Sequence, residues 1–109
     1  MNIETIRDHV IIKPLVTEGF PFGENVLVFK VNNKIFLLTN LDANPLQFNV
    51  KCDPEKAIEL REEFPDSVLP GFHMNKKHWN TVIINGYLLK QQILEMIDNS
   101  YSLVAKIKK

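Results

Sequence analysis

The hydrophobic period of this chain changes from two residues to about 3.6 at Asp53-Pro54, and that change requires a fold that combines strands with helices. Before the change, every second residue is apolar: Leu46, Phe48, Val50 and Cys52. This alternation predicts a strand with one face in the core and Lys51 on the side that meets water. After the change, Asp53 and Pro54 suit the start of a helix, and Pro65 ends it. The apolar stripe of that helix is Ala57, Leu60 and Phe64.

Three further segments have the composition of strands. Residues 26–31 and 34–39 are rich in β-branched and aromatic side chains. Asn32-Asn33 lies between them and favours a hairpin, because asparagine tolerates positive φ. Residues 79–84 form another apolar run, which closes at the turn dipeptide Asn85-Gly86.

Helical spacing is present at both ends of the chain. Residues 3–12 predict a short helix with Asn2 as its N-cap, which stops before Pro14. Near the C-terminus an apolar stripe is formed by Leu89, Ile93, Met96 and Ile97. Asp98-Asn99-Ser100 is polar and predicts an interruption there. A second helical segment would then contain Tyr101, Val104 and Ile107.

The order of these elements predicts an α+β fold, with one antiparallel sheet and helices packed on one face. We expect a loop over residues 14–25, which hold prolines and glycines, and Val68-Leu69 is too short to assign. The whole chain, residues 1–109, is expected to form a single domain. A sheet covered on one side leaves Asn49 and Lys51 on a hydrated face.

Composition excludes several classes of protein. The chain is 45% hydrophobic and 24% charged, which argues against disorder. No apolar run approaches the roughly 20 residues of a membrane-spanning helix. The N-terminus lacks the pattern of a secretory signal, and Cys52 is the single cysteine. We therefore expect a cytoplasmic protein without internal disulfides or membrane contact.

Charge is balanced overall and unevenly distributed along the chain. Residues 1–66 hold seven Lys/Arg and eleven Asp/Glu, a balance of −4, whereas residues 67–109 hold six lysines and two acids, a balance of +4. Strong non-specific binding of nucleic acid usually needs a basic surplus, which this chain lacks. The uneven distribution predicts either two faces of opposite sign or an even mixture in three dimensions.

The segment from Pro70 to Asn80 concentrates polar chemistry between a turn and a strand. It contains two histidines, two lysines and the single tryptophan, and loops on a rigid scaffold often carry binding residues. Together with Lys51, the candidate site residues are His73, Asn75, Lys76, Lys77, His78 and Trp79.

Several motifs resemble the MmcQ/YjbR family over essentially the whole chain. They are Phe20-Pro21-Phe22-Gly23, Lys34-Ile35-Phe36, Lys51-Cys52-Asp53-Pro54-Glu55, residues 70–82 with Pro70-Gly71-Phe72-His73-Met74-Asn75 and Lys76-Lys77-His78-Trp79-Asn80, and residues 98–104. The resemblance implies a frataxin-like two-layer sandwich and the double-wing DNA-binding label that family members carry. It supplies no catalytic residue.

DNA or RNA binding is the first functional hypothesis. Lysines neutralise phosphates, asparagine positions or reads bases, and an exposed aromatic ring stacks on a base. The competing interpretations are structural: Trp79 fills the core, adjacent lysines are merely solvated, and His73-Met74-Asn75 locks the loop by bonding to the backbone.

The same residues are compatible with other functions. The amides, imidazoles and Lys51 could receive a small anion such as phosphate or a carboxylate, or a protein partner. Metal binding is not expected, because His73 and His78 lie five residues apart and do not share one helical face. No cofactor is expected, and no enzymatic activity is expected either. Cys52 and a histidine could form a nucleophile–base pair, but no catalytic motif accompanies them.

Overall fold

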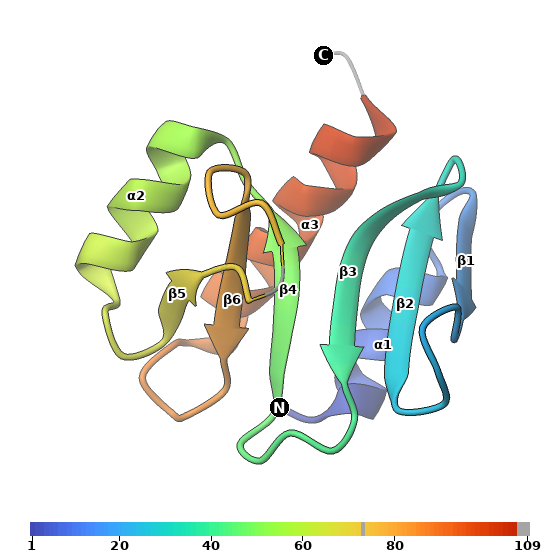
Figure 1. The fold of residues 1–109 in the computed structure, drawn as a ribbon, viewed down its shortest axis with the longest axis horizontal. Coiled ribbons are helices and arrows are strands. Elements are labelled where there is room, and N and C mark those ends of the chain that lie inside the picture. The colour runs from blue at the N-terminus through green and yellow to red at the C-terminus, as the bar shows by residue number, and fades with distance from the viewer. Residues whose placement is uncertain (73, 107–109) are drawn as a thin grey trace.

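Among residues 1–72 and 74–106, which the computed structural model describes, six strands form one sheet in the order β1-β2-β3-β4-β6-β5 (Figure 1). The strands are β1 (Val16–Gly19), β2 (Val26–Val31), β3 (Lys34–Asn40), β4 (Gln47–Lys51), β5 (Val68–Pro70) and β6 (Trp79–Ile83). The helices are α1 (Ile3–Ile11), α2 (Pro54–Glu63) and α3 (Lys90–Ala105). Every neighbouring pair of strands is antiparallel, which confirms the predicted α+β class.

The core lies between the sheet and the helices α1 and α3, which are behind the sheet in Figure 1. Phe29, Phe36 and Phe48 are among its largest fully buried side chains. α2 lies at the β5–β6 end of the same side, where the Asn80 amide donates to the Ala57 carbonyl oxygen at 3.5 Å. Helices therefore pack on one face, as predicted. Within the described residues, no helix has both the length and the apolar character needed to cross a bilayer.

The segment around β4 and α2 follows its sequence pattern closely. Phe48 and Val50 are buried and the intervening Asn49 is half-buried, because alternate side chains of a strand point to opposite faces. Pro54 begins α2 and the helix ends at Glu63, next to the predicted stop. Asp53 is the N-cap residue, as predicted, although its side chain makes no capping hydrogen bond.

Two strands were not predicted from the sequence. The predicted loop 14–25 contains β1, which pairs with β2 from Val16↔Val31 to Gly19↔Val28. Leu15 enters this strand with φ of 64°, a local conformation that no apolar pattern signals. The unassigned Val68-Leu69 belongs to β5, which pairs with β6 and is stabilised by that partner rather than by its own three residues.

The predicted interruption at Asp98-Asn99-Ser100 does not occur, since α3 runs unbroken from Lys90 to Ala105. Its polar residues have tertiary partners that stabilise the helical conformation. The Asp98 carboxylate contacts His9 Nε2 at 2.6 Å and Lys13 Nζ at 2.8 Å, which ties α3 to the end of α1. Partial burial opposes the charge of Asp98, yet hydrogen bonds from Lys13 and His9 outweigh it and hold the pKa of this carboxyl below its ordinary value. Ile107, predicted to extend the last stripe, lies outside the described residues.

Ser100 connects two strands at the point where their own pairing stops. The β3–β4 ladder includes Leu37↔Val50, and beyond that pair the strands diverge (Figure 1). The buried Ser100 hydroxyl donates to the Phe36 carbonyl oxygen at 2.5 Å and accepts from the Lys51 backbone N–H at 2.8 Å. One side chain of α3 therefore satisfies the two backbone groups that the strands leave unpaired.

Gly71 permits the close approach of the chain to β6. Its backbone N–H donates to the Trp79 carbonyl oxygen at 2.9 Å. A Cβ placed on Gly71 would lie 2.8 Å from the Trp79 Cβ and 3.0 Å from the Trp79 carbonyl oxygen. Any larger residue would therefore push the segment after β5 away from the sheet.

We expect Ser100→Ala to lower the free energy of unfolding by about 1–3 kcal/mol, because two buried backbone groups lose their partner. Urea denaturation monitored by circular dichroism measures the change. Ser102→Ala on the same helix is the matched control and should alter stability by no more than about 0.5 kcal/mol. Equal effects of the two substitutions would show that the Ser100 bridge is unimportant.

We expect Gly71→Ala to lower the free energy of unfolding by about 1–3 kcal/mol, because the added methyl group overlaps Trp79. Gly19→Ala serves as the control, since nothing lies within 4 Å of a Cβ at that position. The control should change stability by about 0.5 kcal/mol or less. A Gly71→Ala protein as stable as the Gly19→Ala protein would contradict the close approach.

Candidate functional site

The candidate residues lie mainly in the connecting loop, residues 71–78, which joins β5 to β6. Figure 1 shows this loop in front of β6, on the side opposite α1 and α3. Asn75, Lys76 and Lys77 are exposed. His78 and Trp79 are half-buried. His73 lies outside the described residues, so its predicted role stays a prediction.

Several of these residues make hydrogen bonds that stabilise the conformation of the loop. The Lys76 ammonium donates to the Gly71 carbonyl oxygen at 3.0 Å. The Asn75 side-chain oxygen accepts from the Lys77 backbone N–H at 2.9 Å, a local turn that asparagine favours. The His78 carbonyl oxygen accepts from the Cys52 N–H at 2.7 Å, which joins the loop to the end of β4. The architectural interpretation therefore accounts for part of this motif.

Arg61 of α2 anchors the far end of the loop and was not among the predicted residues. Its Nε donates to Asn80 Oδ1 at 2.7 Å. Its terminal nitrogen donates to the Lys76 carbonyl oxygen and, at 3.2 Å, to that of Trp79. The sequence shows only an arginine among glutamates on a solvated helix, and its partners are at least 15 residues away along the chain.

The open face is the side of the sheet opposite α1 and α3, along the register Val28↔Leu38↔Asn49↔Thr81. Asn49 was expected to meet water there. Instead its Oδ1 accepts from the Thr81 hydroxyl at 2.5 Å, and its Nδ2 donates to the Phe72 carbonyl oxygen at 3.2 Å. The Thr81 oxygen also accepts from the Phe72 backbone N–H at 2.9 Å. These three bonds fix Phe72 above the open face.

An apolar groove of about 480 Å³ runs over this face between two loops. Its two exposed rings are Phe22, 63% exposed, and Phe72, 42% exposed. The groove is lined by Phe22, Val26, Leu38, Asn40, Gln47, Phe48, Asn49, Phe72 and Met74. Phe22 and Phe72 belong to motifs fifty residues apart that carried the family resemblance, and the fold brings them to one site.

Charge differs between the helices and the sheet. The three described helices contain eight carboxylates and four Lys/Arg. The described strands contain three lysines and a single carboxylate, that of Glu18, which Arg7 pairs at 2.5 Å. By strand alternation, Lys30 and Lys51 lie on the open-face side. The acids thus gather with the helices, and Lys76 and Lys77 stand exposed in the loop.

Cys52 does not have the surroundings of an activated nucleophile. Burial raises the pKa of its thiol, and the neighbouring Asp53 carboxylate raises it further. The thiol is therefore protonated at neutral pH. Within residues 1–72 and 74–106, no group of three or more His, Cys, Asp or Glu side chains is placed to hold a metal ion.

Comparison with known proteins identifies the family. The YjbR family model matches residues 12–103. The uncharacterized protein YbdF of Escherichia coli O157:H7 is 35% identical over 101 residues, which cover 93% of this chain and 82% of YbdF. The uncharacterized protein YjbR of Escherichia coli K12 is 31% identical over 101 residues, which cover 93% of this chain and 85% of that protein.

Solved structures show the same fold. A crystal structure of a Deinococcus radiodurans protein with a DUF419 domain matches with a TM-score of 0.93 and 37% identity, over 99% of this chain and 83% of that one. A Pseudomonas syringae protein matches with a TM-score of 0.80 and 26% identity, over 95% of this chain and 99% of that one. With the match to residues 12–103, these likenesses place the chain in the YjbR family.

Proposed function

We propose that this protein binds single-stranded DNA across the open face, with bases stacked on Phe22 and Phe72 and phosphates near the lysines of the connecting loop. The observation that carries the proposal is the presence of two exposed rings, Phe22 and Phe72, in the lining of one groove. Binding in this way needs no nucleophile and no catalytic step.

The aromatic rings support a single-stranded ligand rather than a duplex. Bases in a duplex are stacked on each other, whereas a single strand offers free base faces to protein rings. Such stacking contributes about 1–3 kcal/mol per base. Asn49 and Thr81 hold the backbone of Phe72, so the backbone that carries the ring need not be ordered on binding.

Polar groups support the same ligand. Asn40 and Gln47 line the groove and supply amide donors and acceptors for base edges. Lys76 and Lys77 supply positive charge in a molecule whose formal net charge is zero. Few phosphate contacts are therefore expected, and affinity should rest on stacking more than on counterion release.

The proposal differs in detail from the sequence-based hypothesis. Trp79 was assigned a stacking role, but its side chain is half-buried and its backbone is crowded by Gly71. Phe72 takes over that role because it is the exposed ring nearest along the loop. Lys76 and Lys77 keep their proposed role.

We expect Phe72→Ala to weaken binding of a fluorescein-labelled oligothymidine of about 12 nucleotides by about fivefold to a hundredfold, measured by fluorescence anisotropy at about 50 mM salt. Tyr87→Ala is the matched control, because Tyr87 is 71% exposed and lies outside the groove. The control should change affinity less than about twofold. Absence of binding by the unmodified protein would refute the proposal.

We expect Lys77→Gln to reduce the slope of log affinity against log salt by about 0.7, the contribution of one single-strand phosphate contact. The double substitution of Lys76 and Lys77 should reduce it by about 1.4. Lys34→Gln, an exposed lysine at the β2–β3 turn, is the control and should leave the slope unchanged. A slope that is the same in all four proteins would remove the lysines from the interface.

The groove volume favours one second candidate, a small ligand with a planar ring and an anionic group. About 480 Å³ falls within the range of small-molecule sites, roughly 300–1,000 Å³. A mononucleotide would use the same ring and amide contacts. Titration with uridine monophosphate separates the candidates: affinity equal to that of the oligonucleotide would favour the small ligand, and much weaker affinity would favour the extended strand.

A further inference from the structure

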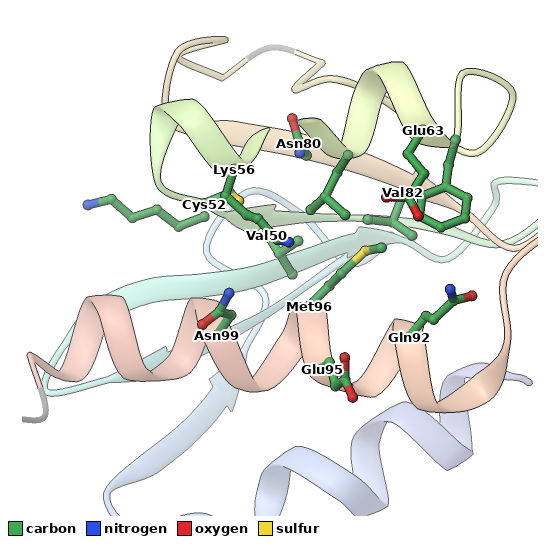
Figure 2. A pocket seen from close by; sticks show the side chains of 13 residues that line it. Val50, Cys52, Lys56, Glu63, Asn80, Val82, Gln92, Glu95, Met96 and Asn99 are labelled. Atoms are coloured by element: carbon green, nitrogen blue, oxygen red, sulfur yellow. The ribbon is translucent and has the colours of Figure 1, made fainter. Parts of the chain in front are cut away.

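A second cavity lies on the helical side of the sheet, between α2 and α3 (Figure 2). This interhelical cleft has a volume of about 200 Å³. Its lining residues come from β4, β6, α2 and α3, and from Cys52 and Phe64, which follow β4 and α2. It shares no lining residue with the groove on the open face.

The floor of the cleft is apolar. Val50 and Val82 are buried at its base, and Met96 of α3 is 9% exposed (Figure 2). Leu60 and Phe64, which the sequence predicted as the core stripe of α2, also line it but are only half-buried. The apolar stripe of α2 is thus incompletely covered, and an apolar group of a ligand would bury it further.

The rim of the cleft is polar and of opposite charge at its two ends. Figure 2 shows Lys56 and Asn99 toward one end and Glu63 and Gln92 toward the other, with Glu95 on the α3 side. Lys56 Nζ is 3.8 Å from a Glu59 carboxylate oxygen, but both side chains are more than half exposed. Such an exposed pair contributes little, so the Lys56 ammonium is free to turn toward a ligand.

The spacing between the charged ends of the cleft limits the length of the ligand. Lys56 and Glu63 are seven residues apart on one helix, or about 10 Å along its axis. An extended peptide advances about 3.3–3.6 Å per residue, so two or three residues span this distance with side chains that reach inward. The cleft volume of about 200 Å³ suits a ligand of two residues rather than three.

We infer that the interhelical cleft is a binding site for a small apolar zwitterion of dipeptide size. The carboxylate of the ligand faces Lys56 and Asn99, and its ammonium faces Glu63. Its apolar side chain contacts Met96, Leu60 and Phe64. The carboxylate and ammonium each gain a charge-assisted hydrogen bond at the partly desolvated rim.

The three methionines allow a site-resolved test with the full chain. Met96 lines the interhelical cleft, Met74 lines the open-face groove, and Met1 lies elsewhere. With ¹³C-methyl methionine, titration with alanyl-leucine should shift the Met96 methyl resonance and leave that of Met74 in place. The same spectrum taken with the oligonucleotide should move Met74, so failure of one proposal is distinguishable from failure of the other.

Modified peptides test each charge. Acetylated alanyl-leucine lacks the ammonium and alanyl-leucine amide lacks the carboxylate, and each should bind at least about fivefold more weakly than the free dipeptide. Lys56→Gln should weaken the free dipeptide but not the amide. Glu63→Gln should weaken the free dipeptide but not the acetylated form.

Glu62→Gln is the matched control for Glu63→Gln, because Glu62 is an exposed residue of α2 outside the cleft. It should leave the affinity for the free dipeptide unchanged. The inference is overturned if Met96 does not shift with millimolar dipeptide, if Met74 shifts in its place, or if all three peptides bind equally well.

Discussion

The Ser100 hydroxyl connects β3 to β4 where the ladder between these strands ends, and the position of α3 on the sheet depends on this bridge. A helix that packs only through apolar side chains can slide by small steps, whereas a buried hydroxyl with two backbone partners has one satisfied position. The bridge therefore aligns α3 along the sheet. Met96, Asn99 and Gln92, one wall of the interhelical cleft, take their places from that alignment.

The connecting loop combines architecture with recognition. Arg61, Gly71 and the Asn49–Thr81 pair fix its backbone at separate points. That anchoring uses the amides and the Lys76 ammonium, which the sequence had suggested as ligand contacts. What remains available is the Phe72 ring and the Lys77 side chain, both exposed, together with the positive charge of Lys76, which is also exposed. A backbone that is held at these points loses little conformational entropy on binding.

Predictions that depend on local sequence pattern were confirmed, whereas features that depend on tertiary contacts were missed or predicted wrongly. The alternation in β4, the Asn32-Asn33 hairpin and the start of α2 at Pro54 were predicted because each depends on neighbours within a few residues. β1 and β5 were missed because short strands are stabilised by their partners. The break predicted at Asp98 to Ser100 was wrong because His9, Lys13 and the strand ends supply bonds that polar residues in an isolated helix would lack.

The candidate site was predicted as a loop but not as a surface. Its lysines and its place before the strand at residues 79–84 followed from composition, whereas Arg61 and the shared groove of Phe22 and Phe72 did not. The sequence by itself determined the α+β class, the alternation that divides core from open face, and the separation of charge along the chain. Only the tertiary structure decided which rings line one groove and which polar groups are used to hold the loop. The physical reason is that side chains fifty residues apart become neighbours only through strand register, which no local period specifies.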